Sequence, residues 1–474
     1  MARRQQAAEP RRRRLRIGPR IHRPAPRLVQ DADAIWTRGA ACPPSPGQWT
    51  AVAILVGGLL AGSLLATEFV LAALHPLLFG LFALAASTRL VAALVPRRLT
   101  DAPRLSDADL PAYTIVAPLY REAEIAPGLV AALEALDYPR HRLQALIVLE
   151  ADDHETLAAL TALPLPGFVE LLIAPPGRPR TKPRACNVAL EFATGELLTI
   201  YDAEDRPHPG QLREAAARFA AGSPRLACLQ APLRVDPDRR FLPAQFALEY
   251  AVQFDVVLPM LARLGAPFPL GGTSNHFKVS ALKALGGWDA WNVTEDADLG
   301  FRLAAEGYRL GVLGSPTHEP APDSLSIWLP QRSRWVKGYM QTFGVQTRSP
   351  PHWRTGVMAA FALTLGVSIV SALLHGPFLA WALVSLALAA TGGGSWLSPA
   401  DIGLLAFGWL GAALAASVGM RRAGAALRPT DLLLMPLYWP LQSLAAAHAA
   451  YQLIRCPHRW DKTPHAARTG QAVA

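Results

Sequence analysis

Residues 197–205 read LLTIYDAED, a short apolar run followed by three acids. Apolar runs of this length bounded by polar turns are typical of buried strands. Three similar runs precede it, at residues 113–117, 145–149 and 169–173. Helical patterns separate the runs, at residues 125–136 and 181–192. This alternation predicts an α/β fold with a mostly parallel sheet and helices on both faces.

Two acidic clusters fall where ligands bind in such sheets, at the carboxyl ends of strands. Residues 148–153 read VLEADD, and a carboxylate there suits hydrogen bonding to a uracil or ribose. A solvated acidic turn explains these acids equally well. Asp202 and Glu204 place two carboxylates near one point, which suits Mg²⁺ or Mn²⁺ beside a diphosphate. Asp-x-Glu triplets are also common by chance.

Two further motifs follow along the chain. Thr294-Glu295-Asp296 is both a favourable helix start and a rigid place for a general base, with Asp296 as that base. Residues 331–335 read QRSRW. Arg334 suits bidentate pairing with a diphosphate, and the Trp335 indole suits contact with a sugar ring. An amphipathic helix at a membrane surface explains the same five residues.

Long apolar segments lie on either side of this region. Residues 51–67 and 77–95 are each close to a membrane span, and the short connector at His75-Pro76 predicts a helical hairpin. Arg89, near the end of the second segment, is expected to snorkel. Arginines at both outer flanks predict that both ends are cytoplasmic.

The C-terminal apolar segments are residues 357–374, 378–390, 402–420 and 432–454. Four crossings would leave Arg421-Arg422 outside. Three crossings would leave the basic residues after residue 454 outside. A re-entrant segment 378–390 with an interfacial last segment keeps both clusters inside. The predicted total is four to six crossings.

Charge and composition agree with a mixed membrane and soluble protein. The 474 residues carry a formal net charge of +10, and residues 1–28 hold ten arginines against Glu9. This segment reads as a tail that contacts anionic lipid or is only solvated, and no nucleic-acid partner is required. The four cysteines show no paired or zinc-type spacing.

Together these features predict five regions. They are an Arg-rich cytoplasmic tail without fixed structure (1–48), a transmembrane hairpin (49–98), a cytoplasmic α/β domain with interfacial helices (105–350), a C-terminal transmembrane region (355–454) and a cytoplasmic tail (455–474).

In their order and setting, the motifs resemble those of family 2 inverting glycosyltransferases, the group of cellulose, chitin and hyaluronan synthases. Those enzymes carry a strand-end acid, a DxD-type motif, a TED motif and a Q-x-x-R-W motif between transmembrane segments. The resemblance covers roughly residues 110–345 and implies a GT-A-type fold. In this sequence Glu150-Ala151 replaces the usual aspartate pair, and the second motif ends in Glu204 rather than aspartate.

The resemblance also implies roles for single residues. Asp296 would be the catalytic base, and Asp202 and Glu204 would hold Mg²⁺ or Mn²⁺. The residues expected to bind substrate are Glu150, Asp152, Lys182, Glu295, Gln331, Arg334 and Trp335. Gly271-Gly272-Thr273-Ser274 matches the small-residue loop near the acceptor, and Lys182 opens a segment near the diphosphate.

The implied activity is transfer of a hexose from a UDP-sugar to a growing polysaccharide with inversion. The expected setting is a bacterial-type inner membrane, with a cytoplasmic catalytic domain, membrane lipids and accessory export proteins as partners. One alternative is single-sugar transfer to a lipid acceptor. Another is a non-catalytic receptor or scaffold, and a transporter fits less well because the charged motifs lie in the soluble-type region.

Overall fold

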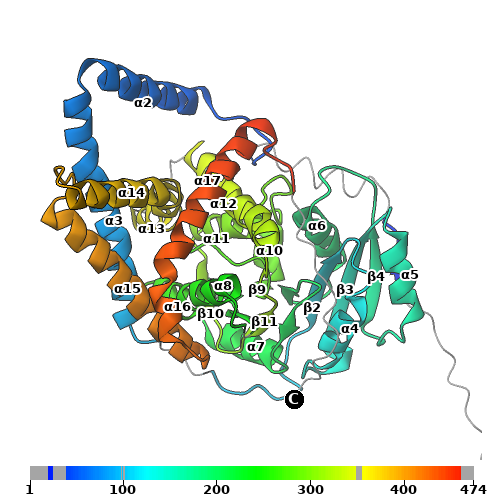
Figure 1. Cartoon of the computed structure of the whole chain (residues 1–474). Coiled ribbons are helices and arrows are strands. Elements are labelled where there is room, and N and C mark those ends of the chain that lie inside the picture. The colour runs from blue at the N-terminus through cyan, green and yellow to red at the C-terminus, as the bar shows by residue number, and fades with distance from the viewer. Residues whose placement is uncertain are drawn as a thin grey trace, which may run out of the picture.

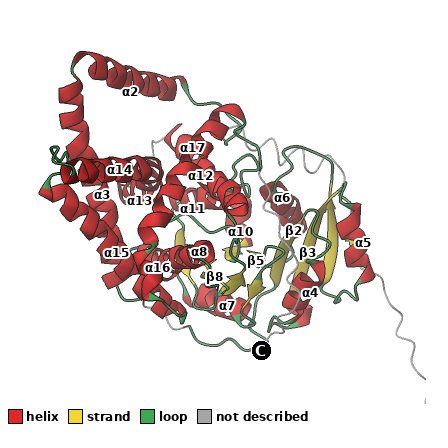
Figure 2. Cartoon of the chain, viewed as in Figure 1, coloured by secondary structure: helices red, strands yellow, loops and turns green. Residues whose placement is uncertain are grey.

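A computed structural model describes residues 20–24, 39–97, 99, 102–236, 238–348 and 355–460. Its main sheet has eight strands in the order β1-β4-β3-β2-β5-β9-β7-β10 (Figures 1 and 2). Their bounds are β1 (Arg20–His22), β2 (Tyr113–Leu119), β3 (Leu143–Glu150), β4 (Val169–Ala174), β5 (Leu197–Ile200), β7 (Leu226–Gln230), β9 (Asn275–Lys278) and β10 (Arg309–Val312). Every pairing is parallel except those of β9 with β5 and β7. The predicted α/β fold with a mostly parallel sheet is confirmed.

The strand order places a topological switch at β2. The chain runs from β2 to β3 and β4 on one side, and then returns to β5 on the other side of β2. Crevices at such switch points are where ligands bind in open α/β sheets. A smaller three-stranded sheet, in the order β6-β11-β8, lies beyond β5 in the chain. Its strands are β6 (Arg206–Pro207), β8 (Leu233–Val235) and β11 (Thr317–Glu319).

Helices cover both faces of the main sheet, because successive strand residues point to opposite sides. Ile115 and Ala117 of β2 join one apolar core with residues of α4 (Ala126–Glu134), α5 (His154–Ala162) and α7 (Gln211–Ala221). Val116, between them, joins a second core on the opposite face. That core includes residues of α6 (Lys182–Phe192), α8 (Phe241–Val252), η2 (Gln253–Val257), α9 (Leu258–Arg263), α10 (Val279–Ala284) and α11 (Glu295–Ala305).

Apolar helices lie on the side of the molecule away from β3 and β4 (Figure 1). By length and composition, four helices of the described chain are able to cross a membrane: α2 (Pro46–Leu65), α3 (Thr67–Leu94), the helix Gly356–Ala390 and α15 (Pro399–Ala423). The third runs through α13 (Thr355–Phe361), η3 (Ala362–Gly366) and α14 (Val367–Ala390). The remaining helices are η1 (Arg140–Arg142), α12 (Leu325–Arg348), α16 (Pro429–Leu433) and α17 (Met435–Arg455).

The helix boundaries differ from the predicted apolar segments in two places. The expected connector at His75-Pro76 lies inside α3, and the chain turns at Ala66, so α2 and α3 meet at a corner (Figure 1). The predicted break before residue 378 is also wrong, because α14 continues through Pro377. The backbone N–H of Gly376 donates to Ser443 Oγ of α17 at 2.8 Å. A neighbouring helix thus supplies a polar partner next to the proline, as in other membrane helices that contain proline.

Part of the expected N-terminal tail belongs to the sheet. Arg20–His22 form β1, which pairs in parallel with β4, and the His22 ring lies 2.7 Å from the Glu170 carboxylate. The Arg11–Arg14 run lies outside the described residues, as does the predicted C-terminal tail after residue 460.

Candidate active site

One cavity of about 900 Å³ joins the carboxyl ends of β2, β3 and β5 to the apolar helices. Nine of the ten predicted site residues line it: Glu150, Lys182, Asp202, Glu204, Glu295, Asp296, Gln331, Arg334 and Trp335. They come from the ends of the strands β3 and β5 and from the helices α6, α11 and α12. The fold therefore brings together side chains that lie up to 185 residues apart in the sequence.

Asp152 is the predicted site residue that does not line this cavity. Its carboxylate is 40% exposed and pairs with Arg180 at 2.7 Å. Glu150, the alternative at the same strand end, is buried. Burial raises the pKa of the Glu150 carboxyl, and the charge of Arg184 opposes that rise. The strand end thus points Glu150, and not Asp152, at the cavity.

The turn after β5 carries Asp202, Glu204 and Asp205, and these residues form the acidic floor of the cavity. The Lys182 ammonium donates to the Asp202 carboxylate and, at 2.6 Å, to the carbonyl oxygen of Gly272. Burial and the Asp202 charge raise the pKa values of Glu204 and Asp205 well above their ordinary range. Thr273 Oγ1 donates to the Asp205 carboxylate, whose Oδ1 is buried without a hydrogen-bond partner. Acidic side chains are therefore concentrated here, with the Lys182 ammonium paired to Asp202.

Carboxylate oxygens that suit a metal ion are present on this floor, but these side chains do not form a complete coordination shell. Within the described ranges, no group of three or more His, Cys, Asp or Glu side chains is arranged to hold a metal ion. Mg²⁺ commonly takes one or two carboxylates and completes its shell with phosphate oxygens and water. Asp202 and Glu204 fit that pattern, because both are carboxylates that line the cavity.

Asp296 lies in the first turn of α11, beside the small-residue loop. A Cβ added at Gly272 would lie 3.7 Å from Asp296 Oδ2, so the loop backbone passes close to this carboxylate. Burial raises the pKa of Asp296 to about 6, although the N–H of Ala297 and the Lys182 and Arg334 charges oppose the rise. The neighbouring Glu295 has its pKa raised to about 8 by burial and by the Asp296 charge. A carboxylate with a pKa near neutrality suits a general base.

Thr294 takes the expected N-cap position of α11, but its hydroxyl makes no capping hydrogen bond and is buried without a partner. Its side chain instead faces Gly338 of α12. A Cβ at Gly338 would lie 2.2 Å from Thr294 Oγ1 and 2.7 Å from its Cβ. Thr294 is thus a packing contact between α11 and α12, next to Asp296.

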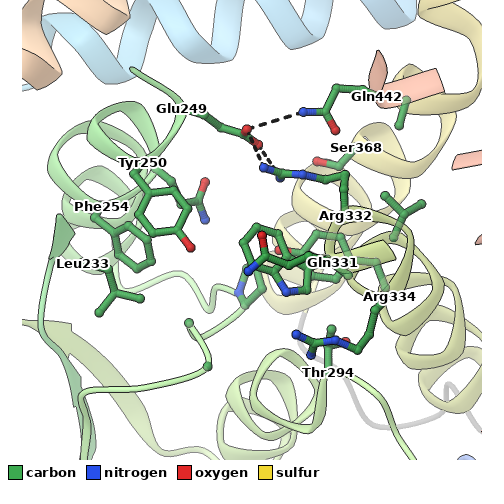
Figure 3. A pocket seen from close by; sticks show the side chains of 18 of the residues that line it. Leu233, Glu249, Tyr250, Phe254, Thr294, Gln331, Arg332, Arg334, Ser368 and Gln442 are labelled. Atoms are coloured by element: carbon green, nitrogen blue, oxygen red, sulfur yellow. Dashed lines mark hydrogen bonds and ion pairs between the residues drawn. The ribbon is translucent and has the colours of Figure 1, made fainter. Parts of the chain in front are cut away.

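The predicted QRSRW motif lies on α12 (Figure 3). The Arg334 guanidinium lies 4.7 Å from the centre of the Trp460 ring. Burial lowers its pKa, and the charges of Glu295 and Asp296 oppose this. Trp335 packs near the rings of Phe246 and Tyr250, with centroid distances of 6.0 and 6.3 Å. Arg334 therefore adds positive charge beside the acids, and Trp335 adds an aromatic wall.

Arg332 is a site-lining residue that the sequence analysis missed. It pairs with both carboxylate oxygens of Glu249, at 2.6 and 2.8 Å (Figure 3). Its guanidinium also lies 4.5 Å from the centre of the Trp335 ring. The Tyr438 hydroxyl donates to the same Glu249 carboxylate at 2.9 Å. This group ties α8, α12 and α17 together directly behind Trp335.

Glu319 of β11 also lines the cavity and was not predicted. Burial, and next the Asp205 charge, raise its pKa to about 8. A single glutamate in a short strand carries no motif, so the sequence offers no signal for it.

The family model for glycosyl transferase family group 2 matches residues 197–419, which include Asp202, Asp296 and the QRSRW motif. This match covers just under half of the chain, and over that part the chain is similar to the family 2 glycosyltransferases. The predicted family is thereby confirmed.

Two curated relatives illustrate its similarity to other members. The probable glycosyltransferase YdaM of Bacillus subtilis is 24% identical over 248 residues, which cover 48% of this chain and 56% of the relative. The beta-monoglucosyldiacylglycerol synthase of Synechocystis is 26% identical over 247 residues, half of each chain. The chain thus spans about half the length of the curated relatives that it matches.

Among solved structures, the mannosyltransferase PcManGT of Pyrobaculum calidifontis, in complex with GDP-Man and Mn²⁺, aligns with a TM-score of 0.47 and 18% identity. The alignment covers 79% of the glycosyltransferase and 99% of that chain.

Proposed function

We propose that this glycosyltransferase moves a hexose from a nucleoside diphosphate sugar to an acceptor hydroxyl, with inversion at the anomeric carbon. The observation that carries the proposal is the position of Asp296 in the cavity. Its carboxylate is close to the Gly272 backbone and shares the cavity with the Asp202 floor and with Trp335. One base, one acidic floor for the diphosphate end and one aromatic wall are the parts that a single displacement requires.

In the proposed step, Asp296 accepts the proton of the acceptor hydroxyl as its oxygen bonds to the anomeric carbon. Lys182 and Arg334 supply positive charge toward the departing diphosphate. Glu150 is the proposed nucleoside contact at the end of β3, as its burial in the cavity favours it over Asp152. UDP as the nucleotide remains a prediction from the sequence.

A divalent ion is proposed on Asp202 and Glu204. These residues offer hard oxygen ligands, and burial and mutual repulsion raise the pKa values of Glu204 and Asp205, so a bound cation would stabilise their ionised forms. When bound, Mg²⁺ or Mn²⁺ would neutralise diphosphate charge.

The membrane setting is proposed from the four apolar helices and the continuity of the cavity with them. An inner membrane location with the α/β domain on the cytoplasmic face fits the arginine distribution. Growth of a polysaccharide remains a prediction that product length on a gel tests. Transfer to a lipid is the second candidate, since one side of the cavity is formed by these apolar helices.

Replacement of the proposed base tests the enzyme function. An Asp296→Asn variant keeps the shape of the side chain but cannot accept the proton, so we expect turnover to fall by about 10²–10⁴-fold. Binding of the donor should persist, as measured by protection of the purified protein against thermal unfolding. Glu306→Gln, an exposed change at the other end of α11, is the matched control.

Full turnover by the Asp296→Asn variant would contradict the proposal. A wild-type protein that binds donor but neither transfers nor hydrolyses it, with either metal, would favour the receptor alternative.

A further inference from the structure

The cavity has two parts with different chemistry. Its floor holds the acids and Lys182 described above, whereas its upper part is formed by α3, η3, α14, α15 and α17. Aliphatic and aromatic side chains dominate the upper walls, among them Phe82, Leu363, Val367, Leu379, Leu404 and Leu405. A surface of this kind favours hydrocarbon over a sugar chain, whose hydroxyls need hydrogen-bond partners when they leave water.

Arg89 stands out in this apolar wall. It belongs to α3, a helix that is able to span a membrane, and its exposed side chain lines the cavity. Within the described chain, no hydrogen bond or ion pair engages its guanidinium. Ionisable residues within membrane helices mark functional sites, because a charge among lipids is costly.

The charges around Arg89 leave one unit of positive charge. Glu249 exerts the attraction on Arg89, but its two oxygens are already held by Arg332 at 2.6 and 2.8 Å. Arg89, Arg332 and Glu249 therefore sum to +1 at the boundary between the polar floor and the apolar walls. A ligand with one negative charge at this level complements them.

The depth of Arg89 matches a lipid headgroup. Arg89 precedes the end of α3 at Leu94 by five residues, which is about 7.5 Å along a helix. The end of α3 contacts the α/β domain, where Arg97 pairs with Asp255 at 2.5 Å. Arg89 thus lies about one headgroup layer from the end of α3, where the proposed membrane helix would leave the bilayer.

We propose that the upper cavity binds the acceptor, and that the acceptor is a phospholipid with a phosphodiester and a free hydroxyl. This inference rests on the proposed function. The phosphodiester lies at Arg89, the acyl chains lie along α3, α14 and α15, and the hydroxyl reaches the floor beside Trp335. The hydroxyl oxygen bonds to the anomeric carbon, the bond from that carbon to the nucleoside diphosphate breaks, and Asp296 takes the hydroxyl proton.

The test uses the full-length protein in vesicles with labelled nucleotide sugars. Phosphatidylglycerol in phosphatidylcholine supplies both hydroxyl and phosphate, and diacylglycerol in phosphatidylcholine supplies the hydroxyl alone. We expect label in the chloroform-extractable lipid with phosphatidylglycerol only. Equal labelling of diacylglycerol, or a long water-soluble product, would overturn the inference.

Variants at Arg89 test the charge itself. We expect Arg89→Gln to lower transfer to phosphatidylglycerol by about tenfold or more, and Arg89→Lys to retain most of it. Arg421→Gln, at the exposed end of α15 and away from the cavity lining, is the control. The thermal unfolding midpoint of Arg89→Gln, compared with those of the wild type and Arg421→Gln, separates loss of acceptor binding from misfolding.

The outcomes also separate this inference from the proposed function. If the wild type hydrolyses donor in an Asp296-dependent manner but labels neither lipid, the phospholipid acceptor is wrong and the glycosyltransferase site stands. If no donor is consumed under any condition, both fail. Unchanged transfer by Arg89→Gln would overturn the role of Arg89.

Discussion

Asp296 illustrates how a single residue gains its chemistry from its surroundings. It is partly buried at the start of α11, and burial is the main cause of its raised pKa of about 6. It also lies close to the Gly272 backbone, where the proposed mechanism requires the acceptor hydroxyl. A solvent-exposed aspartate would titrate near 4 and would be a weaker base at neutral pH.

The raised pKa of Asp296 predicts the acidic limb of the pH profile. A base works only when deprotonated, so kcat/KM should rise as pH increases through about 6 and level off above it. Below about pH 5 the carboxyl is protonated and activity should be lost. Initial rates from pH 4.5 to 8.5 at saturating metal measure this dependence. A kcat/KM that stays constant down to pH 4.5 would show that Asp296 is not the base.

Sequence reasoning named the acidic side chains that line the cavity, but it missed the ion pair of Arg332 and Glu249 beside Trp335. Asp202, Asp296 and Trp335 sit in motifs with fixed spacing, so they could be named from the sequence alone. Arg332 occupies a position of the Q-x-x-R-W motif at which any residue is allowed, and Glu249 lies outside all the motifs. Their role depends on a contact across 83 residues between α8 and α12, which only the folded chain shows.

At the scale of elements, the close approach of α11 and α12 sets the position of Asp296, the proposed base. Gly338 leaves no room for a side chain opposite Thr294, which precedes the first turn of α11, where the proposed base lies. Thr294 is buried and β-branched, so it cannot rotate away from an added methyl group without strain. Gly338 therefore sets the spacing between the base and the QRSRW motif.

We expect Gly338→Ala to lower kcat by about tenfold to a hundredfold, because even a displacement of about 1 Å at the catalytic turn is costly. Donor binding should change less than kcat. Gly344→Ala on the same helix is the matched control, since nothing lies within 4 Å of its added Cβ. Steady-state rates with the two variants side by side would show equal effects if the contact with Thr294 is unimportant.

The sequence located the elements of the α/β region better than those of the apolar region. The strands β2 to β5 were expected close to their observed bounds, because turn residues delimit them. In the apolar region, breaks were expected at His75-Pro76 and between residues 374 and 378, where α3 and α14 continue. Apolar composition marks a helix but not its ends, which depend on partners such as Ser443.

At the scale of the whole molecule, a buried charge cluster joins the apolar helices to the α/β domain. Asp255 is fully buried and pairs with Arg97, after α3, at 2.5 Å and with Arg234 of β8 at 3.5 Å. Arg422 of α15 donates to the Asp255 carbonyl at 3.0 Å and to that of Val95 at 2.7 Å. The cluster holds the α/β domain, and with it the cavity, in a fixed position relative to the apolar helices.

Removal of the central carboxylate should loosen this junction. Asp255→Asn leaves two arginines without their counter-charge, and breaking a buried pair typically costs about 3–5 kcal/mol. We expect a clear drop in the thermal unfolding midpoint of the detergent-solubilised protein. Asp107→Asn, which removes an exposed partner of Arg213, should leave the midpoint nearly unchanged, and an equal drop in both would argue against the cluster.

The pairing of β1 with β4 has a practical consequence for anyone who shortens this protein. Without residues 20–22, β4 becomes the sheet edge, with unpaired backbone groups along Glu170, Leu171 and Leu172. Bare, apolar edges recruit strands from other molecules. A protein truncated just before α2 should therefore self-associate more than one that keeps β1, as light scattering at equal concentration would show. Residues 20–22 would then protect the protein from association with its own copies.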